Sequence, residues 1–183
     1  MKLSDTRYYA GLGLALIFLG LVAIAEWVVG VYRWYSTFRG NEFTMYIFGV
    51  EISKFLALSV YMLLILTGFL VLRLYYVEKR NVFMLSSIST IVYGVVLLIV
   101  TFLETIFPSV SENIYFVLIN VVSPYARLVI WIMIGTCLYI IGDTFLDNKN
   151  IRIASLLMVF ILFYPFGLIS AGKELMETSI EMK

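Results

Sequence analysis

Histidine and glutamine are absent from this 183-residue sequence, and cysteine occurs once, as Cys137. Without histidine the chain offers no bis-histidine haem ligation, no imidazole for the usual zinc and copper sites, and no histidine-based proton relay. A single cysteine cannot form an internal disulfide, a CxxC redox pair or a cluster site. We therefore expect no cofactor and no metal site, and we interpret Cys137 as a small buried packing residue.

Charge is also scarce, since 14% of residues are charged and 62% are hydrophobic, with a mean hydropathy of +1.00. That leaves too little polar surface to coat a water-soluble globule of this length. A net charge of +1 without a basic run interleaved with aromatics excludes nucleic acid as a partner. The sequence also lacks a phosphate-binding glycine loop, which excludes nucleotide. The expected solvent is the lipid bilayer.

Apolar runs of about 20 residues, the length that crosses the hydrocarbon core, recur along the chain. They are continuous and lack the alternation of barrel strands, so the sequence predicts an all-α, polytopic integral membrane helical bundle forming a single domain over residues 1–183. We predict about five transmembrane helices, at residues 8–32, 52–76, 82–107, 114–141 and 151–171. The first run resembles a cleavable signal peptide at Ala23-Ile24-Ala25, but apolar sequence continues to Tyr32, which favours a retained span.

The fourth span has two readings, because Pro124 interrupts it. Ser123-Pro124 is a good helix start, with serine as N-cap and proline at the first helical position. In that case a half-helix over residues 113–122 precedes the span. If one helix instead runs from Ile114 to Ile141, Pro124 kinks it and Arg127 lies near mid-membrane.

Aromatic and basic residues are mixed in the connection 33–51, which includes Arg33, Trp34 and Arg39. Such a composition predicts an interfacial loop, with amphipathic rings at headgroup level and arginines reaching lipid phosphates. A docking surface for a partner is the alternative. With five spans, seven basic residues fall on the N-terminal side and five, including Lys173 and Lys183, on the other, which predicts a cytoplasmic N-terminus and an external C-terminus in the cell membrane.

Ionisable residues inside spans are the best indicators of function, because burying a charged side chain in hydrocarbon costs several kcal/mol unless it is paired with an opposite charge or hydrated. The candidates are Glu26, Lys54, Glu104 and Arg127. Counted along each helix, Glu26 and Glu104 lie roughly 9 Å and 5 Å inside the same membrane face, and Lys54 begins its span there. We predict a shared polar layer, which is either an ion-pair network or a site for an ion, a proton or a polar ligand.

Small residues predict where helices meet, since they let backbones approach closely. Ser86, Thr90 and Gly94 recur every four residues in the third span, and Gly11 and Ala15 do so in the first. Glycines 13, 20 and 30 extend this pattern along the first span.

Three function classes fit these features. We expect a non-catalytic, structural subunit of a larger membrane complex, such as a respiratory or other energy-converting assembly, whose partners are other membrane subunits or a second copy. The alternative is a small transporter or channel component that uses Glu26, Glu104 and Arg127. A membrane enzyme acting on lipid or quinone is the third class. The absence of glutamine, together with abundant isoleucine, valine and tyrosine, is compatible with a heat-adapted source.

Overall fold

The computed structural model describes residues 6–40, 45–47, 50–106, 122–160 and 163–181, and almost all of these residues are helical. Within this part, four helices are long and apolar enough to cross a membrane: α1 (Thr6–Phe38), α2 (Ile52–Glu78), α3 (Asn81–Ile106) and α5 (Ser123–Ile140), which continues into the π-helical turn η2 (Ile141–Phe145). The only described strands are β1 (Tyr46–Ile47) and β2 (Val50–Glu51), paired antiparallel. A helical fold suited to a multi-pass membrane protein is confirmed, whereas the count of five is not.

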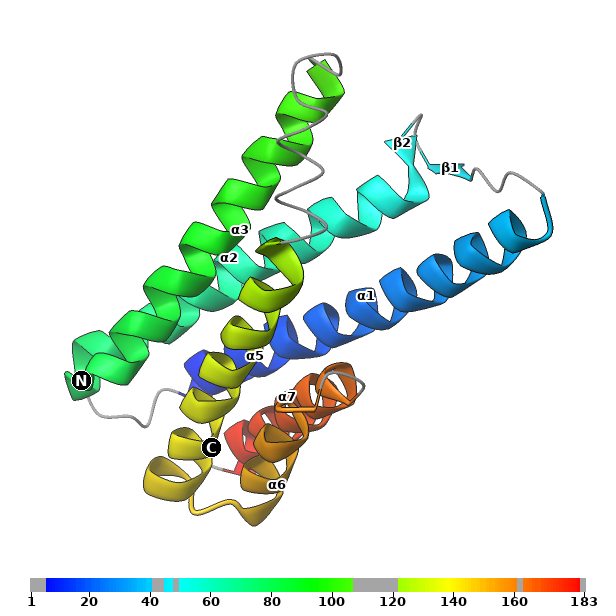
Figure 1. Ribbon diagram of the computed structural model, residues 1–183. Helices are drawn as coiled ribbons and strands as arrows, with labels where there is room; N and C mark the ends of the chain where they lie inside the picture. Colours follow the sequence, from blue (N-terminus) through cyan, green and yellow to red (C-terminus); the bar gives the residue numbers. More distant parts are fainter. Residues whose placement is uncertain (1–5, 41–44, 48–49, 107–121, 161–162, 182–183) are drawn as a thin grey trace.

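The first three long helices run up, down and up (Figure 1). Near the start of α1, the Tyr8 hydroxyl donates to the carbonyl of Leu70 late in α2, at 2.7 Å. Late in α1, Arg33 lies 3.3 Å from Glu51, which directly precedes α2. The end that holds the start of α1 and the α2–α3 turn is called the N-terminal end below, and the opposite end is called the far end.

Helix α1 continues past the end predicted for the first span. The hydroxyls of Ser36 and Thr37 donate to the carbonyl of Arg33, both at 2.9 Å, and the helix stops just before Gly40, whose φ is +73°. Residues 33–38 of the predicted interfacial loop are therefore helical, because nothing before Gly40 breaks the helix. At 1.5 Å per residue α1 is about 50 Å long, more than the roughly 30 Å hydrocarbon core.

The predicted fifth span, 151–171, is not one continuous helix. Helix α6 (Lys149–Leu157) ends in tight turns, in which the N–H groups of Met158, Val159 and Phe160 each donate to a carbonyl three residues earlier. Helix α7 (Tyr164–Glu181) then begins with Pro165 at its second residue, a position at which proline costs no helical hydrogen bond. The apolar segment predicted as one span is thus divided between two helices, α6 and α7.

These two helices form a hairpin that returns to the end from which it started. Gly167 near the start of α7 packs on Ala154 and Met158, and Asn148 just before α6 donates to Glu174 near the middle of α7, at 3.4 Å. At 1.5 Å per residue α6 is about 14 Å long, roughly half the thickness of the hydrocarbon core, whereas the 18-residue α7 is about 27 Å long. Helix α6 is therefore too short to cross the core alone, and α7 runs back along it.

The hairpin packs on α1 through glycines. A Cβ on Gly13 would lie 2.5 Å from the carbonyl oxygen of Gly172, and a Cβ on Gly172 would lie 2.5 Å from that of Gly13. Farther along α1, Gly20 meets Pro165, so the two helices are antiparallel and α7 ends where α1 begins. The start of α1 and the end of α7 thus lie at the same end of the bundle, whereas the sequence predicted a cytoplasmic N-terminus and an external C-terminus.

The small residues of α3 and α1 differ in how well their contacts were predicted. Gly94 packs against Tyr61 and Ile65 of α2, which confirms the α3 row at that position. Gly13 and Gly20 also face neighbouring helices, whereas a Cβ on Gly11 or Gly30 would meet nothing within 4 Å. The contact face of α1 is therefore the one with Gly13 and Gly20.

Substituting Gly13 tests the α1–α7 contact. Gly13→Ala places a methyl group against backbone, so we expect the protein to lose about 1–3 kcal/mol of stability. Gly11→Ala is the matched control, because its methyl group enters open space and alanine favours the helix by about 1 kcal/mol. The measurement is the thermal unfolding midpoint of both variants in one detergent. Equal midpoints for the two variants would contradict the packing described.

Candidate functional site

The four ionisable residues singled out in the spans form two pairs of opposite charge. Arg127 Nη1 lies 3.5 Å from Glu26 Oε2, and Lys54 Nζ lies 3.2 Å from Glu104 Oε1. Glu26 and Glu104 thus have different partners, which come from α5 and α2 respectively. Each pair joins two helices, through residues that are 101 positions apart for Arg127 and Glu26 and 50 positions apart for Lys54 and Glu104.

Around the first pair, hydroxyl groups come from two further elements. The Tyr93 hydroxyl of α3 lies 2.8 Å from Ser123 Oγ at the start of α5, and it also interacts with Arg127 one turn later. Ser123 therefore bonds across to α3 rather than capping its own helix, and the residue before α5, Val122, is itself helical. The predicted serine N-cap is wrong, and the two readings of the segment before it rest on residues 113–121, which lie outside the described residues.

Tyr164 brings the α6–α7 hairpin to the same place. Its ring stacks on Trp131 of α5 with centroids 4.5 Å apart, and meets Trp27 of α1 edge-on at 5.4 Å. Its side chain also interacts with Arg127. Four elements, α1, α3, α5 and α7, thus converge on one guanidinium group.

Five residues form this polar cluster: Glu26, Tyr93, Ser123, Arg127 and Tyr164. The cluster lies at the level of Glu26, well away from both ends of α1. Glu26 is about 10 Å along the helix from Arg33 and about 28 Å from Arg7. Yet the side chains of Glu26 and Arg127 are 23% and 25% exposed. Because a charged group facing hydrocarbon is costly, this exposed surface requires water or another protein.

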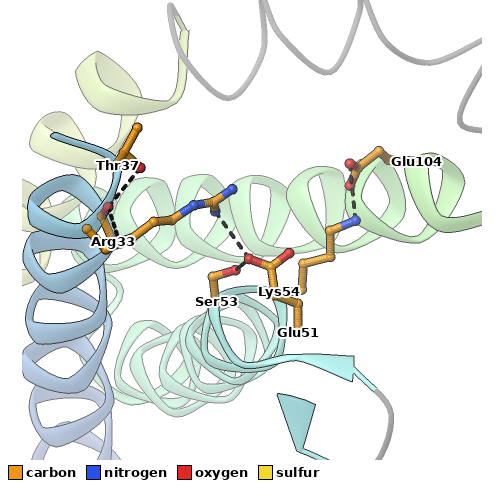
Figure 2. A network of polar contacts seen from close by, with 7 residues as sticks. Arg33, Thr37, Glu51, Ser53, Lys54 and Glu104 are labelled. Atoms are coloured by element: carbon orange, nitrogen blue, oxygen red, sulfur yellow. Dashed lines mark hydrogen bonds and ion pairs between the residues drawn. The ribbon is translucent and has the colours of Figure 1, made fainter. Parts of the chain in front are cut away.

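A second polar cluster closes the far end of the bundle, where Arg33, Glu51, Ser53, Lys54 and Glu104 gather (Figure 2). The guanidinium of Arg33 reaches across from α1 to Glu51 at 3.3 Å, and Ser53 Oγ donates to the same carboxylate at 2.6 Å. Lys54 then connects the start of α2 to Glu104 near the end of α3. This cluster ties three helices together at the depth where the spans end.

Sequence reasoning missed part of both clusters. Tyr93 and Tyr164 were counted as apolar span residues, since nothing in their local sequence shows that their hydroxyls meet a charge. Arg33 was expected to reach lipid phosphates, whereas it lies against Glu51. A tyrosine inside a span was the available indication, because a buried hydroxyl needs a partner.

These clusters are suited to holding helices together. Each charged pair matches one cation with one carboxylate, and in the residues that the structure describes no three acidic or cysteine side chains gather into a metal-binding group. Cys137 is fully buried, as predicted. One acceptor remains open, since Glu104 Oε2 is buried without a hydrogen-bond partner among the described residues.

Comparison of the chain with known protein families, with curated proteins and with solved structures found no match. Its function is therefore inferred from the geometry of the described residues.

Breaking the Glu26–Arg127 pair should be far more costly than breaking the exposed pair at Arg33. Arg127→Met leaves a carboxylate uncompensated inside the bundle, for which we expect a loss of about 3–5 kcal/mol in the free energy of unfolding. The double variant Glu26→Gln/Arg127→Met removes both charges and should recover most of that loss. Denaturant unfolding in one detergent measures both values.

Arg33→Met is the control for this experiment. Arg33 is more than half exposed and Glu51 keeps its bond from Ser53, so the loss should stay below about 1 kcal/mol. If Arg127→Met costs as little as Arg33→Met, the buried pair does not stabilise the bundle.

Proposed function

We propose that the protein is a non-catalytic structural subunit of a larger membrane protein assembly. The observation that carries this proposal is the partial exposure of charged pairs at membrane depth. Lipid tails are a costly neighbour for Glu26, Arg127 and Glu104, whereas polar groups of an adjacent subunit would satisfy them.

The pairing of the charges supports a structural role over ion binding. Glu26 and Arg127 neutralise each other, as do Lys54 and Glu104, so neither pair offers a net charge to a transported ion. Paired charges between helices fix which helices meet and in which register. A subunit with such pairs presents a defined surface to its neighbours.

The last turns of α1 offer an apolar surface for a partner. Trp34 and Phe38 are 70% and 81% exposed, and Tyr32 and Tyr35 beside them are also exposed. Helix α1 is about 20 Å longer than the hydrocarbon core, so part of this aromatic surface lies at or beyond the membrane interface. Aromatic side chains exposed in this way are enriched in protein interfaces.

We further propose that the N-terminal end faces the cytoplasm in the cell membrane. Because α7 returns to the end at which α1 begins, Lys173 joins the N-terminal side rather than the opposite one. That end then carries Arg7, Arg73, Lys79, Arg80, Lys149, Arg152 and Lys173, whereas the described far end carries Arg33, Arg39 and Lys54. An excess of lysine and arginine is typical of cytoplasmic ends.

Transport is the second candidate, favoured by the α6–α7 hairpin. Irregular backbone at membrane depth is tolerated where it is buried in protein or lines a water-filled cavity, and helices that begin there often face a substrate. Helix α7 begins at Tyr164, beside Arg127. In this reading the exposed part of the Glu26–Arg127 pair meets water and a solute.

Gentle extraction followed by native mass measurement separates the two candidates. We expect the protein to leave the membrane with other subunits in fixed ratio. Trp34→Ala/Phe38→Ala should weaken that association, while Phe18→Ala/Leu21→Ala, which removes two half-exposed side chains from the middle of α1, should not. A stable chain that purifies without partners and binds a solute would overturn the subunit proposal in favour of transport.

Cysteine labelling tests the topology. Cys137 is buried, so we expect a maleimide to react only with the introduced cysteines. In intact cells a membrane-impermeant maleimide should label Arg39→Cys at the far end, but not Lys149→Cys or Glu181→Cys, which should react only after permeabilisation. Labelling of Glu181→Cys but not of Lys149→Cys in intact cells would show that 151–171 crosses the membrane, and labelling of both would overturn the proposed orientation.

A further inference from the structure

The N-terminal end of the bundle is divided by charge. On the hairpin side, Arg152 pairs with Asp143 at 2.9 Å and lies 3.7 Å from Asp147, and Lys173 pairs with Glu177. In the segment 73–81 that forms the α2–α3 turn, in contrast, Arg73, Lys79 and Arg80 occur with one acidic residue, Glu78. The turn therefore has a surplus of positive charge.

Aromatic rings hold these three cations. Lys79 Nζ lies 5.5 Å from the ring centroids of both Tyr75 and Tyr76. Arg80 lies over Phe145 at 5.8 Å, and Arg73 over Tyr8 at 5.3 Å. A ring attracts a cation through its face but accepts none of its N–H groups as a carboxylate does. Neither Lys79 nor Arg80 forms an ion pair with a carboxylate within the described residues, so their donors can take an oxyanion.

The backbone fixes the direction of this turn. Lys79 adopts a left-handed conformation with φ +54°, and its N–H donates to the carbonyl of Tyr75 at 2.8 Å, closing the last turn of α2. Helix α3 begins two residues later, at Asn81. Lys79 and Arg80 are thus presented together at the point where two apolar helices end.

This point coincides with the depth of lipid headgroups. Tyr76 is exposed beside Lys79, and amphipathic tyrosine rings favour the membrane interface. Val82 and Leu85, also exposed, continue from the turn along α3 with apolar surface suited to acyl chains. A ligand with a negative head and an apolar tail matches this arrangement.

We propose that the α2–α3 turn binds the phosphate of an anionic phospholipid, through Lys79 and Arg80. A zwitterionic headgroup brings its own cation and gains less from the surplus charge, so anionic lipids bind preferentially. An acidic segment of a partner protein fits the charge but not the apolar surface that continues from the turn. This inference does not depend on the subunit proposal, because a lone chain in a bilayer presents the same turn.

Lipid-dependent stability of the purified full chain tests the proposal. Phosphatidylglycerol added to detergent-solubilised protein should raise the thermal unfolding midpoint more than phosphatidylcholine does, and the difference should shrink at high salt. Lys79→Asn/Arg80→Gln should reduce the difference by at least half. Asparagine is chosen at position 79 because it tolerates the left-handed conformation.

The control, Lys149→Gln/Lys173→Gln, removes the same charge from the same end but on the hairpin side, and should keep the full difference. Midpoints in phosphatidylcholine alone show whether each variant is folded, and single Arg80→Gln replaces the double variant if that one is not. Equal loss in both double variants, or equal stabilisation by the two lipids in the wild type, would overturn the proposal. Native mass spectra should show phosphatidylglycerol retained by the wild type and lost in the turn variant.

Discussion

The contact between Gly13 and Gly172 determines how the rest of the bundle is arranged. Since neither residue has a side chain, α1 and α7 approach until each backbone meets the other, and this holds the α6–α7 hairpin against the first helix. The register set by this contact places Tyr164 between Trp27 and Trp131, and next to Arg127. The polar cluster is thus a consequence of glycine packing some 10 residues away along both helices.

Much of the fold follows from the length and continuity of the apolar runs, and the long helices were predicted for that reason. The stretch 151–171 shows where such reasoning stops, because about 20 apolar residues can form one crossing or two half-crossings of the same hydropathy. The distinction depends on Pro165 near the start of a helix and on Gly167 and Gly172, whose neighbours are set by tertiary packing. Residue counts along the chain cannot supply that information.

The candidate site was predictable to the same degree. Inside a membrane a charge needs a partner, so Glu26 and Arg127 could be expected to meet, and they do. The assignment of Lys54 to Glu104, and of Ser123 to Tyr93 rather than to its own helix end, depends on helix rotation and crossing, which a single sequence does not reveal. The charged residues were therefore found, while the hydroxyls that complete their surroundings were not.

The antiparallel packing of α7 on α1 also bears on how the protein is made. Gly13 and Gly172 are in contact although they lie far apart in the sequence. The contact face of α1 therefore stays uncovered until α7 has left the ribosome. During synthesis the first three long helices are therefore in the bilayer while the face of α1 that carries Gly13 and Gly20 is still uncovered. A factor that shields this face during biogenesis would be released when α7 packs on it, which makes the synthesis of α7 the event that ends the need for shielding.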